Sequence, residues 1–270
     1  MAKYKKKRAR ELQHDKFRDT ANSLLDRLAD RLEGKGKTIL YGVIGVVLVG
    51  VLAGVWVKWN NRKADEARRA LGRGIAIASA PLASAPAADP KAPKFASEQE
   101  RAQKAIVEFQ KVVAKYGDPY RTEARYFIAT SMLYLDRDKG LADLTELSKS
   151  KISEVATLSK FALAQEKERD RKYDEAAQLY SELAAQNSPV VPTETANLYL
   201  AGVYEKQGKK KEAADLLFNI VDAARKAKDK DGTPLPQTAA AGAAAEKLQK
   251  LDPDRSAQLT PALPAGESPF

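Results

Sequence analysis

The feature that most limits what this chain can fold into is a run of twenty residues without a charge, TILYGVIGVVLVGVLAGVWV, from Thr38 to Val57. An α-helix rises about 1.5 Å per residue, so a run of this length can span a hydrocarbon core of about 30 Å. Lysines and arginines bound it on both sides, and Tyr41, Trp56 and Trp59 stand where interfacial aromatic side chains belong. The sequence therefore predicts a single transmembrane helix over residues 38–57.

Two other interpretations fit this run less well. In place of a span it could be a core helix of a soluble domain, but helices of soluble domains usually keep a polar face, which the run lacks. A cleaved signal peptide would have an n-region of 37 residues, and the segment WNNRKADEA after the run offers no good small-x-small cleavage site. We therefore expect an uncleaved anchor.

Glycines recur at four-residue intervals along one side of the predicted span. Gly42, Gly50 and Gly54 share this side with Val46, and the last two glycines form a small-xxx-small pair that lets a second helix approach closely. Glycine is also common in membrane helices that have no such role. Lateral pairing through Gly42, Gly50 and Gly54 therefore stays open beside the simpler explanation.

The N-terminal tail, residues 1–37, bears on orientation. It holds twelve lysines and arginines against six acidic residues and supplies +6 of the net charge of +10. Within about 20 residues of the span the two flanks are nearly balanced, but the whole tail favours a cytoplasmic N-terminus. We expect the C-terminal domain on the opposite side of the membrane.

The same tail carries an amphipathic helical pattern after the basic segment MAKYKKKRAR. Apolar residues recur at three- and four-residue spacing until Gly34, namely Phe17, Ala21, Leu24, Leu25, Leu28 and Leu32. Such a helix can lie on anionic headgroups. A topology signal alone and a non-specific contact with RNA are the alternatives. Because no nucleic-acid-binding fold supports the last of these, we expect membrane-surface docking together with a role as topology signal, and no nucleic-acid partner.

After the span, the spacing of small and large apolar residues predicts helical hairpins. Tetratricopeptide (TPR) repeats are pairs of helices about 34 residues long, with a small residue early in the second helix, a large one four later and another three after that. Three sets match this spacing: Ala105, Phe109 and Val112; Ala176, Tyr180 and Leu183; and Ala213, Leu217 and Ile220. Ala142 is a candidate small residue for a fourth set, but Glu146 and Lys149 follow it, so this repeat is expected to be degenerate or shifted by one residue.

The last repeat matches best, with Leu200, Ala201, Tyr204 and Gly208 in signature places of its first helix and Ala213 and Leu217 in those of its second. Gly208 closes the first helix, and Ala201 lets the second helix cross closely. These signature residues are expected to be structural. For Tyr180 and Tyr204 we favour packing over a place in a binding groove.

The fold class predicted is all-α, a single transmembrane helix followed by a TPR-like helical-hairpin solenoid. The TPR-like domain covers residues 60–251, with a Pro/Ala-rich loop at 80–94 and a capping helix that starts near Pro236 or Thr238. Residues 252–270 are polar and Pro-rich, and are predicted to be a disordered tail.

The residues give no support for catalysis. The chain has no cysteine, and its one histidine, His14, lies in the charged tail without companions for a metal site or a triad. Phosphate-binding loops and nucleophile elbows are also lacking. The adjacent carboxylates Asp174 and Glu175 fall between repeat helices and are expected to be solvated caps. We expect no enzyme activity, no cofactor and no metal.

The order of parts is informative as a whole. A basic helical stretch leads into one Gly/Val-rich span, an exit with Trp56 and Trp59, the pattern Asn60-Asn61…Ala64…Ala67…Ala70…Leu71, and a degenerate TPR domain. Over roughly residues 25–225 this layout resembles the bacterial inner-membrane family described as the ancillary subunit of the Sec translocon. The chain departs from it by a longer basic N-terminus, the insertion at 80–94 and the Pro-rich C-terminus.

The resemblance implies a single-pass inner-membrane protein with a cytoplasmic N-terminus and a periplasmic domain. Its implied partners are translocon subunits, a periplasmic chaperone or unfolded secreted clients, which it would link to one another. From the residues alone we expect a membrane-anchored protein-interaction module. The alternative is a structural or assembly scaffold subunit of another membrane protein complex.

Overall fold

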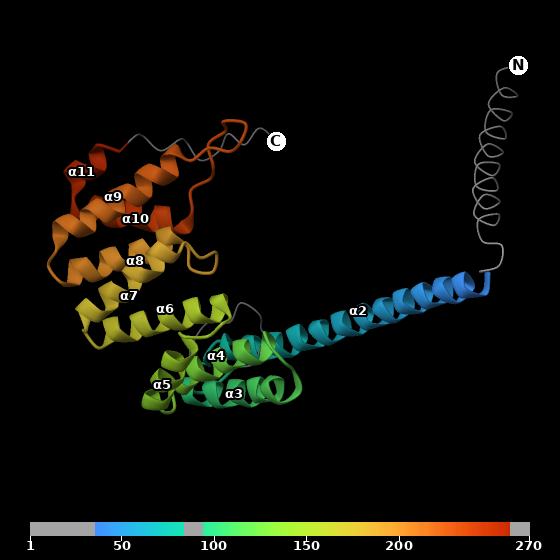
Figure 1. The fold of residues 1–270 in the computed structure, drawn as a ribbon. Helices are drawn as coiled ribbons and strands as arrows, with labels where there is room; N and C mark the ends of the chain where they lie inside the picture. The colour runs from blue at the N-terminus through green and yellow to red at the C-terminus, as the bar shows by residue number, and fades with distance from the viewer. Residues whose placement is uncertain (1–35, 84–93, 260–270) are drawn as a thin grey trace, which may run out of the picture. The chain divides into compact units, whose positions relative to one another are not determined.

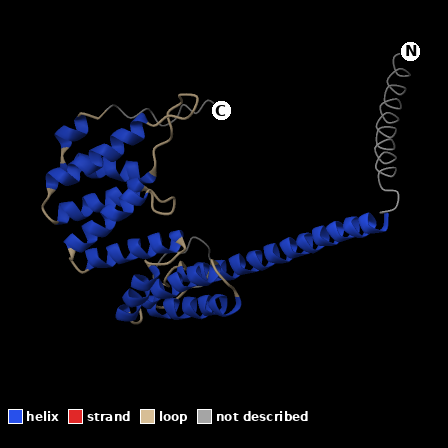
Figure 2. Ribbon diagram, in the orientation of Figure 1, coloured by secondary structure: helices blue, strands red, loops and turns tan. Residues whose placement is uncertain are grey.

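The computed structural model describes residues 36–83 and 94–259. The predicted amphipathic helix of the N-terminal tail and most of the Pro/Ala loop lie outside these ranges. Within them the regular structure is helical (Figure 2), and the only strand-like pairings there are the isolated bridges Leu82–Phe95 and Lys228–Pro234. The all-α prediction is confirmed for the described residues.

The helices follow one another closely along the chain (Figure 1). Their bounds are α2 Gly36–Ala78, α3 Glu98–Lys115, α4 Tyr120–Met132, α5 Arg137–Leu147, α6 Ser153–Arg169, α7 Tyr173–Gln186, α8 Thr193–Lys206, α9 Lys210–Lys226, α10 Ala239–Leu251 and α11 Pro253–Ala257. The chain divides into two compact units, residues 1–64 and 65–270, and α2 runs from one into the other.

Helix α2 contains the whole run predicted to span a membrane. Gly42 and Gly54 lie among its residues whose side chains and surroundings are outside the described part, and Gly50 has open space within 4 Å of its Cβ position. Among the residues that the structure describes, no helix is long and apolar enough to cross a membrane. The span and the glycine pairing therefore stay predictions.

In the second unit, each helix from α3 to α10 packs on the next along the chain. The end of α2 pairs with α3, and α4–α5, α6–α7 and α8–α9 form three further pairs. The first helices of neighbouring pairs also touch, α4 on α6 and α8 on α10. Stacked helix pairs of this kind are the architecture of TPR-like solenoids, so the prediction of such a domain agrees with the structure.

The core consists of four buried clusters, each between neighbouring helices. In the first, Ala105, Phe109 and Val112 of α3 meet Ala70 and Leu71 of α2. Each cluster is shared by successive helices, which explains why small and large residues recur at the repeat length.

The fourth set is not degenerate but shifted, the other alternative, and the shift is two residues instead of one. Ala142 is exposed on α5, and the small residue of this pair is Gly140, two positions earlier. Leu144 and Leu147, four and three residues further on, complete the set and are buried. A Cβ added at Gly140 would lie 2.9 Å from the carbonyl oxygen of Ala129 on α4. The second pair is therefore regular, and the small residues of the four second helices stand 35, 36 and 37 residues apart.

Side chains cap several helices at their N-termini. Ser97 accepts a hydrogen bond from the Glu100 N–H, and the Glu100 carboxylate accepts one from the Ala96 N–H. Asp136 caps α5 in the same way as Ser97 caps α3. Thr238 caps α10 by accepting from the Ala241 N–H, so the capping helix starts at one of its two predicted positions.

The predicted disordered tail is corrected in its first part. Asp252 caps the short helix α11 by accepting from the Arg255 N–H, and Arg255 forms an ion pair with Asp215 of α9. Leu259 is buried with side chains of α9 and α10. An apolar contact and an ion pair thus hold residues 252–259 on the domain, and 260–270 lie outside the described residues.

Candidate functional site

The signature residues of the second helices lie in the core of the repeat domain. They are buried in all three sets that the spacing predicted, namely Ala105 and Phe109 of α3, Ala176 and Tyr180 of α7, and Ala213 and Leu217 of α9. Leu217 is 1 % exposed and packs in the cluster that α9 shares with α10. Buried this deeply, the Leu217 side chain stabilises the domain and is not available to a partner.

The signature residues of α8 are the other part of the predicted set. Leu200 and Ala201 are buried, and Tyr204 is half-buried and packs between two of the clusters. Gly208 follows the end of α8 with φ +77°, a left-handed conformation that glycine adopts without strain. These four residues therefore shape the last repeat, and any site for a partner has to be found elsewhere on its surface.

Three aromatic rings from three helices form one cluster. The ring of Phe161 on α6 meets Tyr199 of α8 edge-on at 5.0 Å between centroids and Tyr180 of α7 at 5.8 Å. Tyr180 and Tyr199 stack at 5.5 Å. Such pairs contribute about 0.5–1.5 kcal/mol each beyond the area they bury. They also hold each ring in one orientation.

Tyr180 is the buried member of this cluster. Its hydroxyl donates a hydrogen bond of 3.1 Å to the Glu168 carboxylate of α6. Burial raises the pKa of Tyr180 well above its usual range, and the neighbouring Glu168 carboxylate raises it further. The neutral phenol is therefore the stable form.

Glu168 also accepts a hydrogen bond of 2.7 Å from the Lys206 ammonium of α8. This bond raises the pKa of Lys206. A second ion pair, Lys247 of α10 with Glu205 of α8, joins the next two first helices at 3.7 Å. The two cations and two carboxylates balance one another.

These side chains line a groove of about 710 Å³ on α6, α8 and α10, which we call the first-helix groove. Its lining residues are Glu168, Leu198, Tyr199, Gly202, Glu205, Lys206 and Lys247. Leu198, Gly202 and Tyr199 supply the apolar part of this lining, and the two ion pairs supply the polar part. Tyr199 is 37 % exposed, so part of its ring is free to contact a partner.

A second hollow, of about 320 Å³, lies between α3, α4 and α6. It is more polar than the first-helix groove, with Arg101, Glu166, Arg169 and the Tyr126 hydroxyl among its lining groups. Burial raises the pKa of Tyr126. Both hollows adjoin α6, one on its α4 side and the other on its α8 side.

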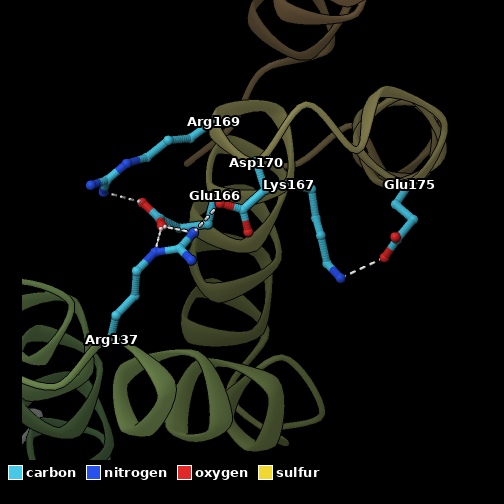
Figure 3. A network of polar contacts seen from close by, with 6 residues as sticks. All are labelled: Arg137, Glu166, Lys167, Arg169, Asp170 and Glu175. Atoms are coloured by element: carbon cyan, nitrogen blue, oxygen red, sulfur yellow. Dashed lines mark hydrogen bonds and ion pairs between the residues drawn. The ribbon is translucent and has the colours of Figure 1, made fainter.

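A polar network connects α6 with its neighbours α5 and α7 (Figure 3). Arg137 at the start of α5 donates to Glu166 from Nε at 2.8 Å and pairs with Asp170 at 2.8 Å. Arg169 reaches the same Glu166 carboxylate at 3.4 Å. Lys167, one residue along, points instead toward Glu175 of α7. The network therefore ties the second helix pair to the third and is structural.

Asp174 and Glu175, predicted to lie between the repeat helices, lie in the first turn of α7, and both have partners. Asp174 accepts a hydrogen bond of 2.8 Å from the Gln207 amide. The bond from Lys167 to Glu175 lowers the pKa of that carboxyl. Among the described residues, no group of three histidine, cysteine, aspartate or glutamate side chains is placed to hold a metal ion.

The sequence prediction missed the groove residues Leu198, Tyr199 and Gly202. They fall between signature positions, so the repeat spacing gives no sign of them. One signal was present: Leu198 and Tyr199 precede the signature pair Leu200–Ala201, and four apolar residues in a row exceed what one buried helix face needs.

Comparison with known proteins gives little further identification. No protein-family model and no curated protein matches the chain. Two solved structures from Podosopora anserina, described as a candidate kinesin light chain with nearly identical TPR-like repeats, are similar in fold. One, a point variant, is 16 % identical with a TM-score of 0.45, and the other is 15 % identical with a TM-score of 0.41. Each alignment covers 73 % of this chain and 87 % of the other.

Proposed function

We propose that the chain is a membrane-anchored protein-interaction module whose first-helix groove takes an apolar side chain of a partner protein. The observation that carries this proposal is the partly exposed Tyr199 side chain in the lining of the groove. Phe161 and Tyr180 fix the ring in one orientation, so little conformational freedom is lost when a partner covers it. Rigid aromatic anchors of this kind dominate many protein interfaces.

The charges of the groove favour selection by shape over selection by net charge. Lys206 and Lys247 are each paired with a carboxylate of the groove itself. A partner with a strong charge of either sign would have to displace one of these pairs. We therefore expect the partner segment to be largely apolar or uncharged where it enters the groove, as unfolded segments of secreted proteins often are.

The proposed anchor is the helix segment Thr38–Val57, supported by its length, its lack of charge and its flanks. Trp59 is exposed just beyond it, with the Lys63 ammonium 3.5 Å from the ring centroid, an arrangement suited to the headgroup region. The proposed location is the bacterial inner membrane, with the N-terminus cytoplasmic and the repeat domain periplasmic.

Membrane fractionation and topology reporters test the anchor. The full chain should stay in the membrane fraction after alkaline carbonate washing, and Leu48→Arg with Leu52→Arg should release it because two central arginines make insertion costly. Reporters fused after Phe270 should be active in the periplasm. Release of the unsubstituted chain, or cytoplasmic reporter activity, would contradict the proposed anchor or its orientation.

The finer role proposed is that of an ancillary translocon subunit, which is supported only by the layout of the sequence. Co-purification in mild detergent tests it. Translocon subunits together with secreted clients or a periplasmic chaperone are the expected partners. Stoichiometric recovery of a different membrane complex would replace this role with that of a scaffold subunit.

A further inference from the structure

Five exposed lysines and arginines gather where the α6–α7 turn lies beside the α8–α9 turn. The hydrogen bond from the Gln207 amide to Asp174 joins the two turns at 2.8 Å. We call the group the cationic edge: Arg171, Lys172, Lys209, Lys210 and Lys211. Three of them line a recess of about 410 Å³ together with Tyr173, Asp174, Glu175 and Gln207. This recess shares no lining residue with the first-helix groove.

The charge of the cationic edge is poorly balanced by the protein itself. In the described part of the chain, none of its five members forms an ion pair. Two of the carboxylates beside them are already paired with other cations, Asp170 with Arg137 and Glu175 with Lys167, and Asp174 accepts a hydrogen bond from the neutral Gln207 amide. Lys172 acts on Glu175 only by lowering its pKa, less than Lys167 does, and Lys209 lies 5.4 Å from the Tyr204 ring. Positive potential is therefore left for an anion from outside.

The backbone conformation of Arg171 is a second observation that favours a binding role for the cationic edge. Arg171 and Gly208 occupy the same place in consecutive pairs, each five residues before the small signature residue Ala176 or Ala213. Both have positive φ, +59° at Arg171 and +77° at Gly208. Glycine adopts this conformation freely, whereas arginine is strained there. The α6–α7 turn thus has a cationic residue at this position, whereas the α8–α9 turn has glycine, which is not strained there. Strained backbone of this kind is concentrated at functional sites.

We propose that the cationic edge binds an acidic segment of a partner protein. Its carboxylates would face the lysines and arginines, and its backbone would enter the recess. A peptide also provides N–H donors, and the exposed Asp174 carboxylate in the recess can accept a hydrogen bond from one of them. A phosphodiester backbone has no such donor, so it offers no hydrogen bond to the Asp174 carboxylate of the recess. A flat bilayer surface does not enter a recess.

The test measures peptide binding by the purified full chain in a neutral detergent. The probe is a fluorescein-labelled peptide in which Glu and Asp alternate with Gly and Ser, and the comparison peptide carries Gln and Asn instead. We expect saturable binding of the acidic peptide only, weakened by salt because exposed charges are screened. Replacing Lys209, Lys210 and Lys211 by Gln should weaken binding about tenfold, since each exposed pair contributes modestly.

A matched variant removes the same charge elsewhere. Lys149, Lys151 and Lys230 are exposed and lie outside both the cationic edge and the groove. Their replacement by Gln should leave the affinity for the acidic peptide within about twofold, because distant surface charges are screened. An equal loss in both triple variants would overturn the proposal, since it would show only a response to net charge.

Arg171→Gly separates a binding role from a structural one. Relief of the strained φ should raise the thermal midpoint by about 2–4 °C for a domain of this size, while affinity for the acidic peptide falls. A lower midpoint or an unchanged affinity would contradict the proposal. So would binding of a single-stranded oligonucleotide or a short-chain phosphatidylserine without binding of the acidic peptide. Failure here leaves the first-helix groove untouched, because the variants do not alter its lining.

Discussion

The ring of Tyr199 stacks on the ring of Tyr180 at 5.5 Å between centroids, so a partly exposed aromatic side chain rests directly on a buried one. The buried ring is in turn tied through its hydroxyl to Glu168, which also receives Lys206. The buried Tyr180 ring thus contacts both the exposed Tyr199 ring of the first-helix groove and the Glu168 carboxylate that pairs with Lys206. Substitutions at Tyr180 should affect both stability and the groove.

Tyr180→Phe should lower the free energy of unfolding by about 1 kcal/mol, because it removes one hydrogen bond to a charged acceptor and keeps the ring. The effect should also depend on pH. The pKa of Tyr180 is raised on folding, so its contribution is fully present below about pH 10 and is lost as the pH rises above the value of the unfolded chain. Denaturant melts between neutral pH and pH 11 should show a shallower alkaline decline in the variant. Parallel declines would argue against a buried neutral phenol at this position.

Gly140→Ala should destabilise the domain by about 1–2 kcal/mol, because the added Cβ would lie 2.9 Å from backbone atoms of Ala129 and Leu133. Gly242→Ala is the matched variant: it lies inside α10 with open space around its Cβ position, so helix propensity should make it stabilising by about 0.5–1 kcal/mol. Chemical unfolding of both variants measures the difference. Effects of the same sign would mean that α4 and α5 do not cross closely at Gly140.

Leu259→Ala should lower the free energy of unfolding by about 2 kcal/mol, because its side chain is buried against α9 and α10. Leu235→Ala serves as the control, since Leu235 is 47 % exposed in the loop before α10 and should change stability by less than about 0.5 kcal/mol. Thermal melts of both variants would decide the point. A neutral result at Leu259 would restore the original expectation that the chain is unstructured after Leu251.

Arg137→Met should lower the free energy of unfolding by about 1 kcal/mol at low salt, and by less in 1 M NaCl, because it breaks half-buried ion pairs from α5 to α6. Lys111→Met, which removes a pair within α3, should change stability by only about 0.3 kcal/mol. Urea titrations at two salt concentrations compare them. A salt-independent loss at Arg137 would point to packing of its stem instead of its charge.

The repeat domain could be predicted from sequence because each helix pair buries the same kind of residue at the same place. The second helices of three pairs can be recognised from their small residues Ala105, Ala176 and Ala213, because a small residue is required wherever two helices cross closely. Gly140 was overlooked for a physical reason: glycine disfavours helix interiors, so the nearby Ala142 was the more plausible small residue. The structure shows that close approach to Ala129 outweighs that cost.

The groove and the cationic edge were beyond such reasoning. The groove that Tyr199 lines is formed by the stacking of α6, α8 and α10. The spacing of residues within one helix does not predict that arrangement. In the sequence, the lysines of the cationic edge look like ordinary solvated surface residues. Arg171 and Lys172 lie beside Lys209 only because the fold brings the two turns together. The attachment of residues 252–259 was missed because one leucine, Leu259, carries it within an otherwise polar segment.

The measurement that tests the central claim most directly is site-specific photocrosslinking in living cells. A benzophenone side chain replaces Tyr199 in the groove or Val107 on α3, which is 50 % exposed and lines none of the three hollows described above. Crosslinked products from Tyr199 that are lost when Leu198 and Gly202 are changed to Glu, with few products from Val107, are the predicted result. Equal crosslinking from both positions, or none from Tyr199, would contradict the account of the first-helix groove as a protein-binding surface.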